Sequence, residues 1–200
     1  MNLLFVDCCI SQRGGKSRTA RLCAAFLDAL EESVSDVAVE HLDLTRRELR
    51  PFDVAMLDAR DALFAAGAFE DDVYALARQF RDADAVVVGA PFWDLSFPAQ
   101  LRIYLEHISA NGVTYYYDER GPHGSCKAQW LAYLTSGGDF ERDGSIGVEY
   151  WRQLCGMHGI PRYEHVFAGG LDIDPSQVEP LMANACGKAC ELAKELARVR

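Results

Sequence analysis

Residues 84–91, "DAVVVGAP", decide the fold class of this 200-residue chain. An uninterrupted apolar run of this length is typical of a strand that is covered on both faces, as the strands of a parallel sheet are. Similar runs predict four further strands at 3–7, 37–44, 128–138 and 164–170. Amphipathic stretches predict helices at 17–32, about 56–82, 99–108, 144–158 and about 175–200.

This alternation of strand and helix predicts an α/β fold, in which a parallel sheet carries helices on both faces. Right-handed crossovers limit the possible topologies to a few doubly wound orders. Half of the residues are hydrophobic, and a chain of 200 residues is long enough for one well-filled core but short for two. We therefore expect residues 1–200 to form a single domain.

The composition argues against several classes of partner. A formal net charge of -10 disfavours nucleic acid, since proteins that bind a phosphate backbone usually present basic surfaces. No apolar run approaches the length of a membrane span, and residues 1–9 lack the basic start of a signal peptide. The seven scattered cysteines favour reduced thiols in a cytoplasmic protein. Neither the cysteines nor the five histidines have a metal-ligand spacing, so we expect no bound metal. Because no apolar run is long enough to span a bilayer, we also expect no membrane contact.

The segment 109–127, "SANGVTYYYDERGPHGSCK", is too long for an ordinary connection between a helix and a strand. Its three consecutive tyrosines, followed by Gly-Pro and Gly, favour a β-ribbon inserted before the fourth strand. We expect this ribbon to be a flap over a binding site. The alternative is a surface excursion that is packed only by its own aromatic side chains.

A ligand of an open parallel sheet binds beyond the carboxyl ends of the strands, near the point where the strand order switches. The loops after the first, third and fourth predicted strands should therefore converge there. They are "CCISQRGGKSRT" at 8–19, "APFWDLSFPAQL" at 90–101 and "LTSGGDFE" at 134–141. Polar, glycine-rich loops are common at this edge, but all three of these loops carry residues suited to a binding site.

The first loop contains Gly-Gly-Lys-Ser, yet it fails two phosphate-binding templates. A P-loop needs a glycine where this chain has Ile10. A low-molecular-weight tyrosine phosphatase has five residues between its cysteine and its arginine, whereas only four separate Cys8 from Arg13. The loop is therefore neither a triphosphate loop nor a phosphatase loop.

The same loop does fit a seat for one phosphate group. Ser11, Ser17 and Thr19 offer hydroxyl donors, and Arg13 offers a positive charge. The next helix begins near Ser17 with free backbone N–H groups and the positive end of its dipole. Ser17 could instead be only the N-cap of that helix, but a single cap does not account for the other three residues.

The second and third loops predict a flat ligand. Phe92 and Trp93 follow the buried strand directly and offer an aromatic wall, which Pro91 and Pro98 stiffen. These aromatic side chains could alternatively belong to a subunit interface. Residues 135–138 supply small side chains where the edge of a ring can meet backbone donors. A phosphate seat, an aromatic wall and a glycine edge together point to flavin mononucleotide (FMN).

Over about residues 3–172 the chain resembles the flavodoxin-like NAD(P)H-dependent oxidoreductases, specifically the FMN-dependent NADH-azoreductase and quinone-reductase family. The family's phosphate loop corresponds to Ser11, Arg13, Ser17 and Thr19. Its aromatic loop is similar to "PFWDLSFPAQLR", its flap to "GVTYYYDERGPHG" and its glycine loop to "TSGGD", while "LCGMHGI" and "VFAGGL" match the later pattern. The resemblance implies a flavodoxin-like sheet of five strands in the order 2-1-3-4-5.

The resemblance also implies what the site does. NAD(P)H would leave a hydride on the flavin, and a quinone, azo compound or related small-molecule electron acceptor would then take the electrons at the same place, without a catalytic side chain. Tyr117 in the flap is the expected substrate contact, and a homodimer with the site at its interface is the expected assembly. The expected FMN-binding residues are Ser11, Arg13, Ser17, Arg18, Thr19, Pro91, Phe92, Trp93, Asp94, Leu95, Thr135, Ser136, Gly137 and Gly138.

The chain departs from the family pattern at a few positions. Asp94 stands where azoreductases commonly have asparagine, Trp93 stands where tyrosine is frequent, and "SGGD" lacks a frequent arginine. We expect these changes to affect substrate choice more than reaction class. The fold also leaves two other functions open: an electron carrier of the flavodoxin type, and a flavin-binding regulator or FMN-free interaction protein. The long flap and the aromatic loop favour the enzyme.

Overall fold

Five parallel strands form the central sheet in the order β2-β1-β3-β6-β7, which confirms the predicted order 2-1-3-4-5. The computed structural model describes residues 1–10, 17–141 and 145–199. The strands are β1 (Asn2–Asp7), β2 (Ala38–Asp43), β3 (Ala85–Gly89), β6 (Trp130–Ser136) and β7 (Arg162–Ala168). The order reverses between β1 and β3, so a ligand crevice is expected beyond the carboxyl ends of these two strands.

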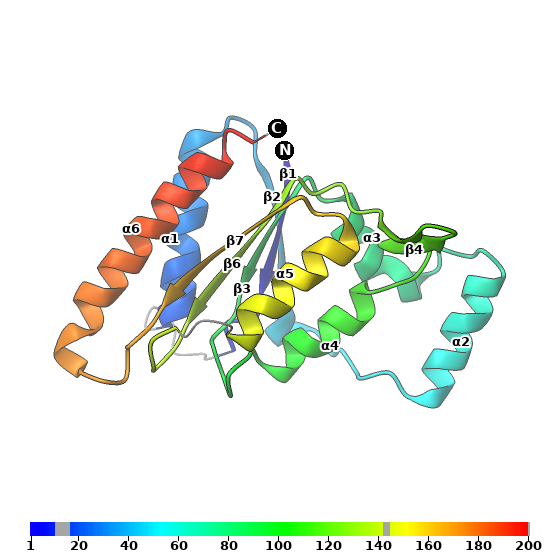
Figure 1. The fold of residues 1–200 in the computed structure, drawn as a ribbon, viewed down its shortest axis with the longest axis horizontal. Coiled ribbons are helices and arrows are strands. Elements are labelled where there is room, and N and C mark those ends of the chain that lie inside the picture. Colours follow the sequence, from blue (N-terminus) through cyan, green and yellow to red (C-terminus); the bar gives the residue numbers. More distant parts are fainter. Residues whose placement is uncertain (11–16, 142–144, 200) are drawn as a thin grey trace.

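Helices cover both faces of the sheet, as predicted (Figure 1). The helices α1 and α6 lie side by side on one face, and α3, α4 and α5 pack on the other. The helices are α1 (Arg18–Ser33), α2 (Val54–Ala65), α3 (Ala75–Asp82), α4 (Ala99–Ile108), α5 (Ile146–His158) and α6 (Val178–Leu196), with 3-10 turns η2 (Leu44–Arg46), η3 (Asp72–Tyr74) and η4 (Pro175–Gln177). Within the described part of the chain, no helix combines the length and the apolarity that a bilayer crossing requires.

The two layers follow from the alternation of side chains along buried strands. On β1, Leu3 and Phe5 pack against α1 and α6, whereas Leu4 and Val6 pack against the opposite helices. All five residues of β3 are buried. A strand with apolar side chains in both directions needs helices on both faces, because each face must be removed from water.

The helical region expected at 56–82 is divided into α2 and α3. Gly67 has a φ of +66°, a left-handed conformation that glycine adopts without steric cost and that is incompatible with a continuing right-handed helix. Helix α2 itself has no buried residue and projects from the body of the protein (Figure 1). Its Val54 and Phe64 side chains are exposed to 74% and 43%. The helix therefore presents large apolar side chains to solvent in the single chain.

The predicted β-ribbon is present as the hairpin β4 (Tyr115–Asp118) and β5 (Gly121–Gly124). The hairpin does not lie over the carboxyl ends of the strands of its own chain, and its role as a flap over a binding site stays a prediction. Gly124 packs so closely on the end of α5 that a Cβ there would lie 2.0 Å from the backbone nitrogen of Gly159. The Cys126 N–H also donates to the carbonyl of His158 at 3.1 Å. Because α5 ends at the amino-terminal edge of the sheet, the hairpin lies away from the carboxyl ends of the strands.

Candidate functional site

Residues of all three loops that were predicted to converge line one pocket at the carboxyl edge of the sheet. Its volume is about 220 Å³. Backbone hydrogen bonds hold two of the loops together, since the Phe92 N–H donates to the Ser136 carbonyl at 2.9 Å. The pocket is lined by Cys9, Ser17, Arg18, Thr19, Pro91, Phe92, Trp93, Ser136, Gly137, Gly138, Leu171 and Asp172.

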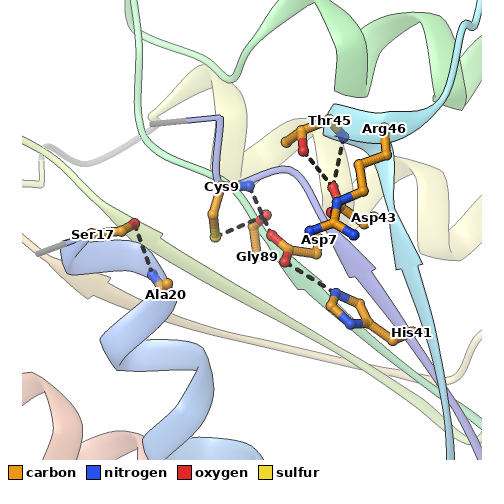
Figure 2. Close-up of polar contacts among 9 residues, drawn as sticks. All are labelled: Asp7, Cys9, Ser17, Ala20, His41, Asp43, Thr45, Arg46 and Gly89. Atoms are coloured by element: carbon orange, nitrogen blue, oxygen red, sulfur yellow. Dashed lines mark hydrogen bonds and ion pairs between the residues drawn. The ribbon is translucent and has the colours of Figure 1, made fainter. Parts of the chain in front are cut away.

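The amino terminus of α1 forms one end of the pocket. Ser17 is the N-cap of this helix, and its Oγ accepts a hydrogen bond from the Ala20 N–H at 3.3 Å (Figure 2). Ser17 also lines the pocket, so the capping role and the binding role occur in the same residue. The first turn of a helix has N–H groups without intrahelical acceptors and a partial positive charge, which suits an anion. Ser11 and Arg13 lie outside the described residues.

Thr19 connects the first loop to the third. Its Oγ1 lies 2.6 Å from Oγ of Ser136, at the end of β6, and both side chains are buried. A hydroxyl can donate and accept at once, so each of these two oxygens keeps further hydrogen-bonding capacity toward the pocket. Thr135 is also fully buried, but it does not line the pocket.

The aromatic loop enters the pocket from β3. Phe92 packs edge-on against Phe167, with ring centroids 5.1 Å apart, whereas Trp93 is 47% exposed. Trp93 and Ser96 exchange two backbone hydrogen bonds of 3.2 and 2.8 Å around a tight turn. Asp94 and Leu95, the central residues of this turn, have φ values of +49° and +65° and do not line the pocket. Left-handed backbone is uncommon for such residues, and the exchanged bonds stabilise it here.

Gly137 and Gly138 form the edge opposite the aromatic loop. A Cβ at Gly137 would lie 2.9 Å from Cζ of Phe167, and a Cβ at Gly138 would lie 2.5 Å from Oδ2 of Asp172. Both positions therefore lack room for any larger residue unless a neighbour moves. The small side chains also leave the backbone of this edge accessible to a ligand.

The residues Cys9, Leu171 and Asp172 line the pocket but were not among the predicted binding residues. Leu171 and Asp172 follow β7, whereas the loops predicted to converge follow the first, third and fourth strands. The loop after β7 could have been included from the general rule that all strands of a parallel sheet have their carboxyl ends at the same edge. Conversely, Asp94, Leu95, Thr135 and Tyr117 were predicted as site residues and do not line the pocket.

The segment after β1 is held by a polar cluster that Figure 2 shows. The Asp7 carboxylate accepts from the Cys9 N–H at 2.9 Å, and its other oxygen lies 3.1 Å from Nε2 of His41. On the neighbouring strand, Asp43 accepts from the Thr45 N–H at 2.9 Å. These contacts fix the backbone at the point where the first loop leaves the sheet.

The thiol of Cys9 is not set up as a nucleophile. The pKa of Cys9 is raised strongly above its ordinary value. The largest cause is a hydrogen bond with the Cys23 side chain, and the second is burial of the thiol. The reactive form of cysteine is the thiolate, so Cys9 stays protonated and unreactive at neutral pH. Among the described residues, no group of three or more potential metal ligands occurs.

A larger cavity of about 640 Å³ lies at the opposite, amino-terminal edge of the sheet. Its two arginines are already paired, because Arg78 lies 3.7 Å from Glu70 and Arg81 lies 2.7 Å from Asp82. It lacks the free helix terminus and the glycine edge of the smaller pocket. Ligands of doubly wound sheets bind at the carboxyl edge, so the smaller pocket is the candidate site.

Residues 1–192 match the family model described as "Flavodoxin-like fold", and the chain belongs to this family. Among curated relatives, an FMN-dependent NADH:quinone oxidoreductase 2 of Clostridium acetobutylicum is 30% identical in an alignment of 186 residues that covers 90% of this chain and 92% of the relative. An FMN-dependent NADH:quinone oxidoreductase of Clostridium perfringens is also 30% identical, with the same coverage. Among solved structures, the azoreductase AzrA superposes with a TM-score of 0.85 at 27% identity, covering 98% of this chain and 100% of that structure.

Proposed function

We propose that this chain binds FMN in the pocket at the carboxyl edge and transfers electrons from NADH or NADPH to a quinone, azo compound or related acceptor. The observation that carries the proposal is the convergence, in one pocket, of a helix amino terminus, an aromatic loop and a glycine edge. The names of the relatives, which are FMN-dependent NADH:quinone oxidoreductases, support the same ligand and reaction class.

The residues present fit the phosphate end of FMN. Ser17 and Thr19 place hydroxyl groups at the amino terminus of α1, where helix dipole and backbone N–H groups favour an anion. Ser136 extends this polar end through its contact with Thr19. Ser11 and Arg13 complete the proposed phosphate seat by resemblance.

The ring end is proposed to lie between the aromatic loop and Gly137 and Gly138. Bound FMN supplies the chemistry by accepting a hydride from the nicotinamide and passing the electrons on, so the protein needs no side-chain nucleophile. The N–H groups of Phe92 and Trp93 are already used within the chain. Among the described residues, those of Asp94 and Leu95 donate to no protein acceptor. Neither residue lines the pocket, but their turn directly follows Trp93, which does, and we propose these two N–H groups for the ring.

We further propose a homodimer in which each site is completed by the partner. A pocket of about 220 Å³ is below the usual range of about 300–1,000 Å³ for ligand sites, so the described residues alone enclose less space than most ligands need. Helix α2, with its exposed apolar side chains, supplies a candidate surface for the partner. Tyr117 is 62% exposed on the hairpin and distant from its own pocket. We propose that it contacts the acceptor in the partner's site.

The proposed exchange is a ping-pong reaction, because one site serves the nicotinamide and then the acceptor. The test is to reconstitute the purified protein with FMN and to follow the flavin absorbance anaerobically. Bleaching by NADH or NADPH followed by recovery with a quinone supports the reductase. Bleaching only by dithionite would instead indicate an electron carrier, and failure to bind FMN would exclude both. A panel of quinones, azo dyes and nitroaromatics then defines the acceptor.

A further inference from the structure

An ion pair crosses the mouth of the candidate pocket. Nη1 of Arg18, in the first turn of α1, lies 2.6 Å from Oδ1 of Asp172, which follows β7. The two residues are 154 positions apart in the sequence, and both line the pocket. Their side chains are 34% and 70% exposed. Arg18 is the only arginine or lysine among the described residues that line the pocket, and its guanidinium is already engaged by a carboxylate.

Asp172 also lies beside the glycine edge of the pocket. The Asp172 N–H donates to the carbonyl of Gly138 at 3.1 Å, which places the residue directly beside the glycine edge. The other carboxylate oxygen, Oδ2, lies 2.5 Å from the position that a Cβ on Gly138 would occupy. An anionic ligand entering this pocket meets a negative charge, which opposes its binding.

We propose that Asp172 is a specificity-determining residue that lowers the affinity of the pocket for a phosphate group, because it occupies the Arg18 guanidinium and repels the phosphate oxygens. This inference rests on the proposed function, since the phosphate in question is that of FMN. Its consequence is that the flavin ring contributes a larger share of the binding free energy and that FMN is held as an exchangeable ligand.

The ion pair is weak enough to be displaced. Exposed ion pairs contribute little to stability, because water screens the charges and two long side chains lose freedom. A phosphate at a helix amino terminus can form several charge-assisted hydrogen bonds at once. We therefore infer that FMN draws Arg18 away from Asp172 and that breaking this contact reduces the observed affinity.

A second ion pair provides a matched control. Arg21 and Glu179 join the same two regions of the chain, with Nη2 and Oε2 2.8 Å apart and side chains 39% and 72% exposed. Arg21 lies one turn further along α1, and neither residue lines the pocket. The two pairs have similar exposure but a different relation to the site, and the control pair is bidentate whereas Arg18 and Asp172 share one contact.

The test measures the dissociation constants of FMN and of riboflavin, which lacks the phosphate, by quenching of flavin fluorescence. Asp172→Asn should bind FMN about fivefold more tightly, the factor that corresponds to one exposed ion pair. Its affinity for riboflavin should stay within about twofold, the level expected when no charged group is involved. Glu179→Gln should change neither constant. Arg18→Gln should weaken FMN binding, and adding Asp172→Asn to it should restore only part of the loss.

Three results would overturn the inference alone. One is an Asp172→Asn variant whose affinity for FMN equals that of the unmodified protein, which would mean that Asp172 has no effect on phosphate binding. A weaker affinity would likewise overturn it, because Asp172 would then help to position Arg18 for the phosphate. The third is an equal change for FMN and riboflavin, which would place the effect on the ring. If the unmodified protein binds neither flavin, the proposed function fails together with the inference.

Discussion

The hydroxyl groups of Thr19 and Ser136 meet at 2.6 Å in a buried contact between residues that are 117 positions apart. This contact joins the amino terminus of α1 to the carboxyl end of β6, and it connects the first and third loops of the candidate site. Two loops that the sequence predicts separately are thereby coupled through a single pair of oxygens.

Replacing Thr19 by Val should weaken this coupling. The change leaves Oγ of Ser136 buried without its partner, so we expect a loss of about 1–3 kcal/mol in the free energy of unfolding. The double variant Thr19→Val, Ser136→Ala should recover part of that stability but not the affinity for FMN. Thr45→Val, which removes an exposed hydroxyl contact with Asp43, is the control. Urea unfolding and FMN titration measure both effects, and full FMN affinity in the double variant would contradict the proposed phosphate seat.

Gly137→Ala should disturb the aromatic side of the pocket. The new Cβ would lie 2.9 Å from the Phe167 ring, which packs on Phe92, so the ring pair must move or the backbone must shift. Overpacking of this kind typically costs about 1–3 kcal/mol. We expect a lower Tm and weaker binding of both FMN and riboflavin. Gly187→Ala, at an open position on α6, is the matched control and should not lower the Tm.

His158 should make the protein sensitive to mild acid. Its ring is fully buried, and this burial lowers the pKa from 6.5 to about 4. The unfolded chain takes up a proton below about pH 6.5, whereas the folded chain resists protonation down to about pH 4. Stability is therefore unaffected above pH 6.5 and is lost as the pH falls toward 4, by about 3 kcal/mol in total.

Chemical denaturation between pH 7 and pH 5 measures this effect above the main range of carboxylate titration. His158→Phe preserves the aromatic contact with Phe80 and should flatten the dependence of stability on pH. The His107→Gln variant changes a half-buried imidazole that contacts the Arg50 carbonyl, and it should keep the slope of the unmodified protein. An equal slope in the His158 and His107 variants would assign the acid sensitivity to other groups.

Charged substitutions on α2 should disrupt the proposed homodimer. Val54 and Leu57 are 74% and 39% exposed, so Val54→Glu with Leu57→Glu should leave the fold intact while weakening an apolar contact with a partner. Sedimentation velocity should show a shift toward monomer, with a normal far-UV circular dichroism spectrum. Ala183→Glu adds a charge to an exposed position of α6 and should not change the assembly. A monomeric unmodified protein would remove the dimer proposal.

The sequence predicts the order of the elements well because buried strands and amphipathic helices have different periods. The helix predicted at 99–108 coincides with α4, and the apolar run at 84–91 contains β3. The break at Gly67 was missed because its effect depends on a φ of +66°, which the hydrophobic pattern does not encode. Helical periodicity likewise predicts a helix at α2 without indicating that the described part of the chain buries none of its residues fully.

The site was less accessible to sequence analysis for a related reason. Ser17, Phe92 and Gly137 carry local signals, such as a helix start or a glycine after a strand. Asp172 has no such signal, because its contacts with Arg18 and Gly138 arise only when β7 is placed beside β6. The position of the hairpin was also missed, since it depends on the close packing of Gly124 against the end of α5.

The ladder between β3 and β6 continues beyond the end of β3. The Ala90 N–H donates to the Leu134 carbonyl at 3.1 Å, and the Phe92 N–H donates to the Ser136 carbonyl at 2.9 Å. The aromatic loop after β3 and the glycine edge after β6 therefore continue from two hydrogen-bonded neighbouring strands. The spacing between them is set by this strand pairing. A planar ligand would therefore enter a slot whose width is set by the pairing of β3 with β6 before the ligand arrives.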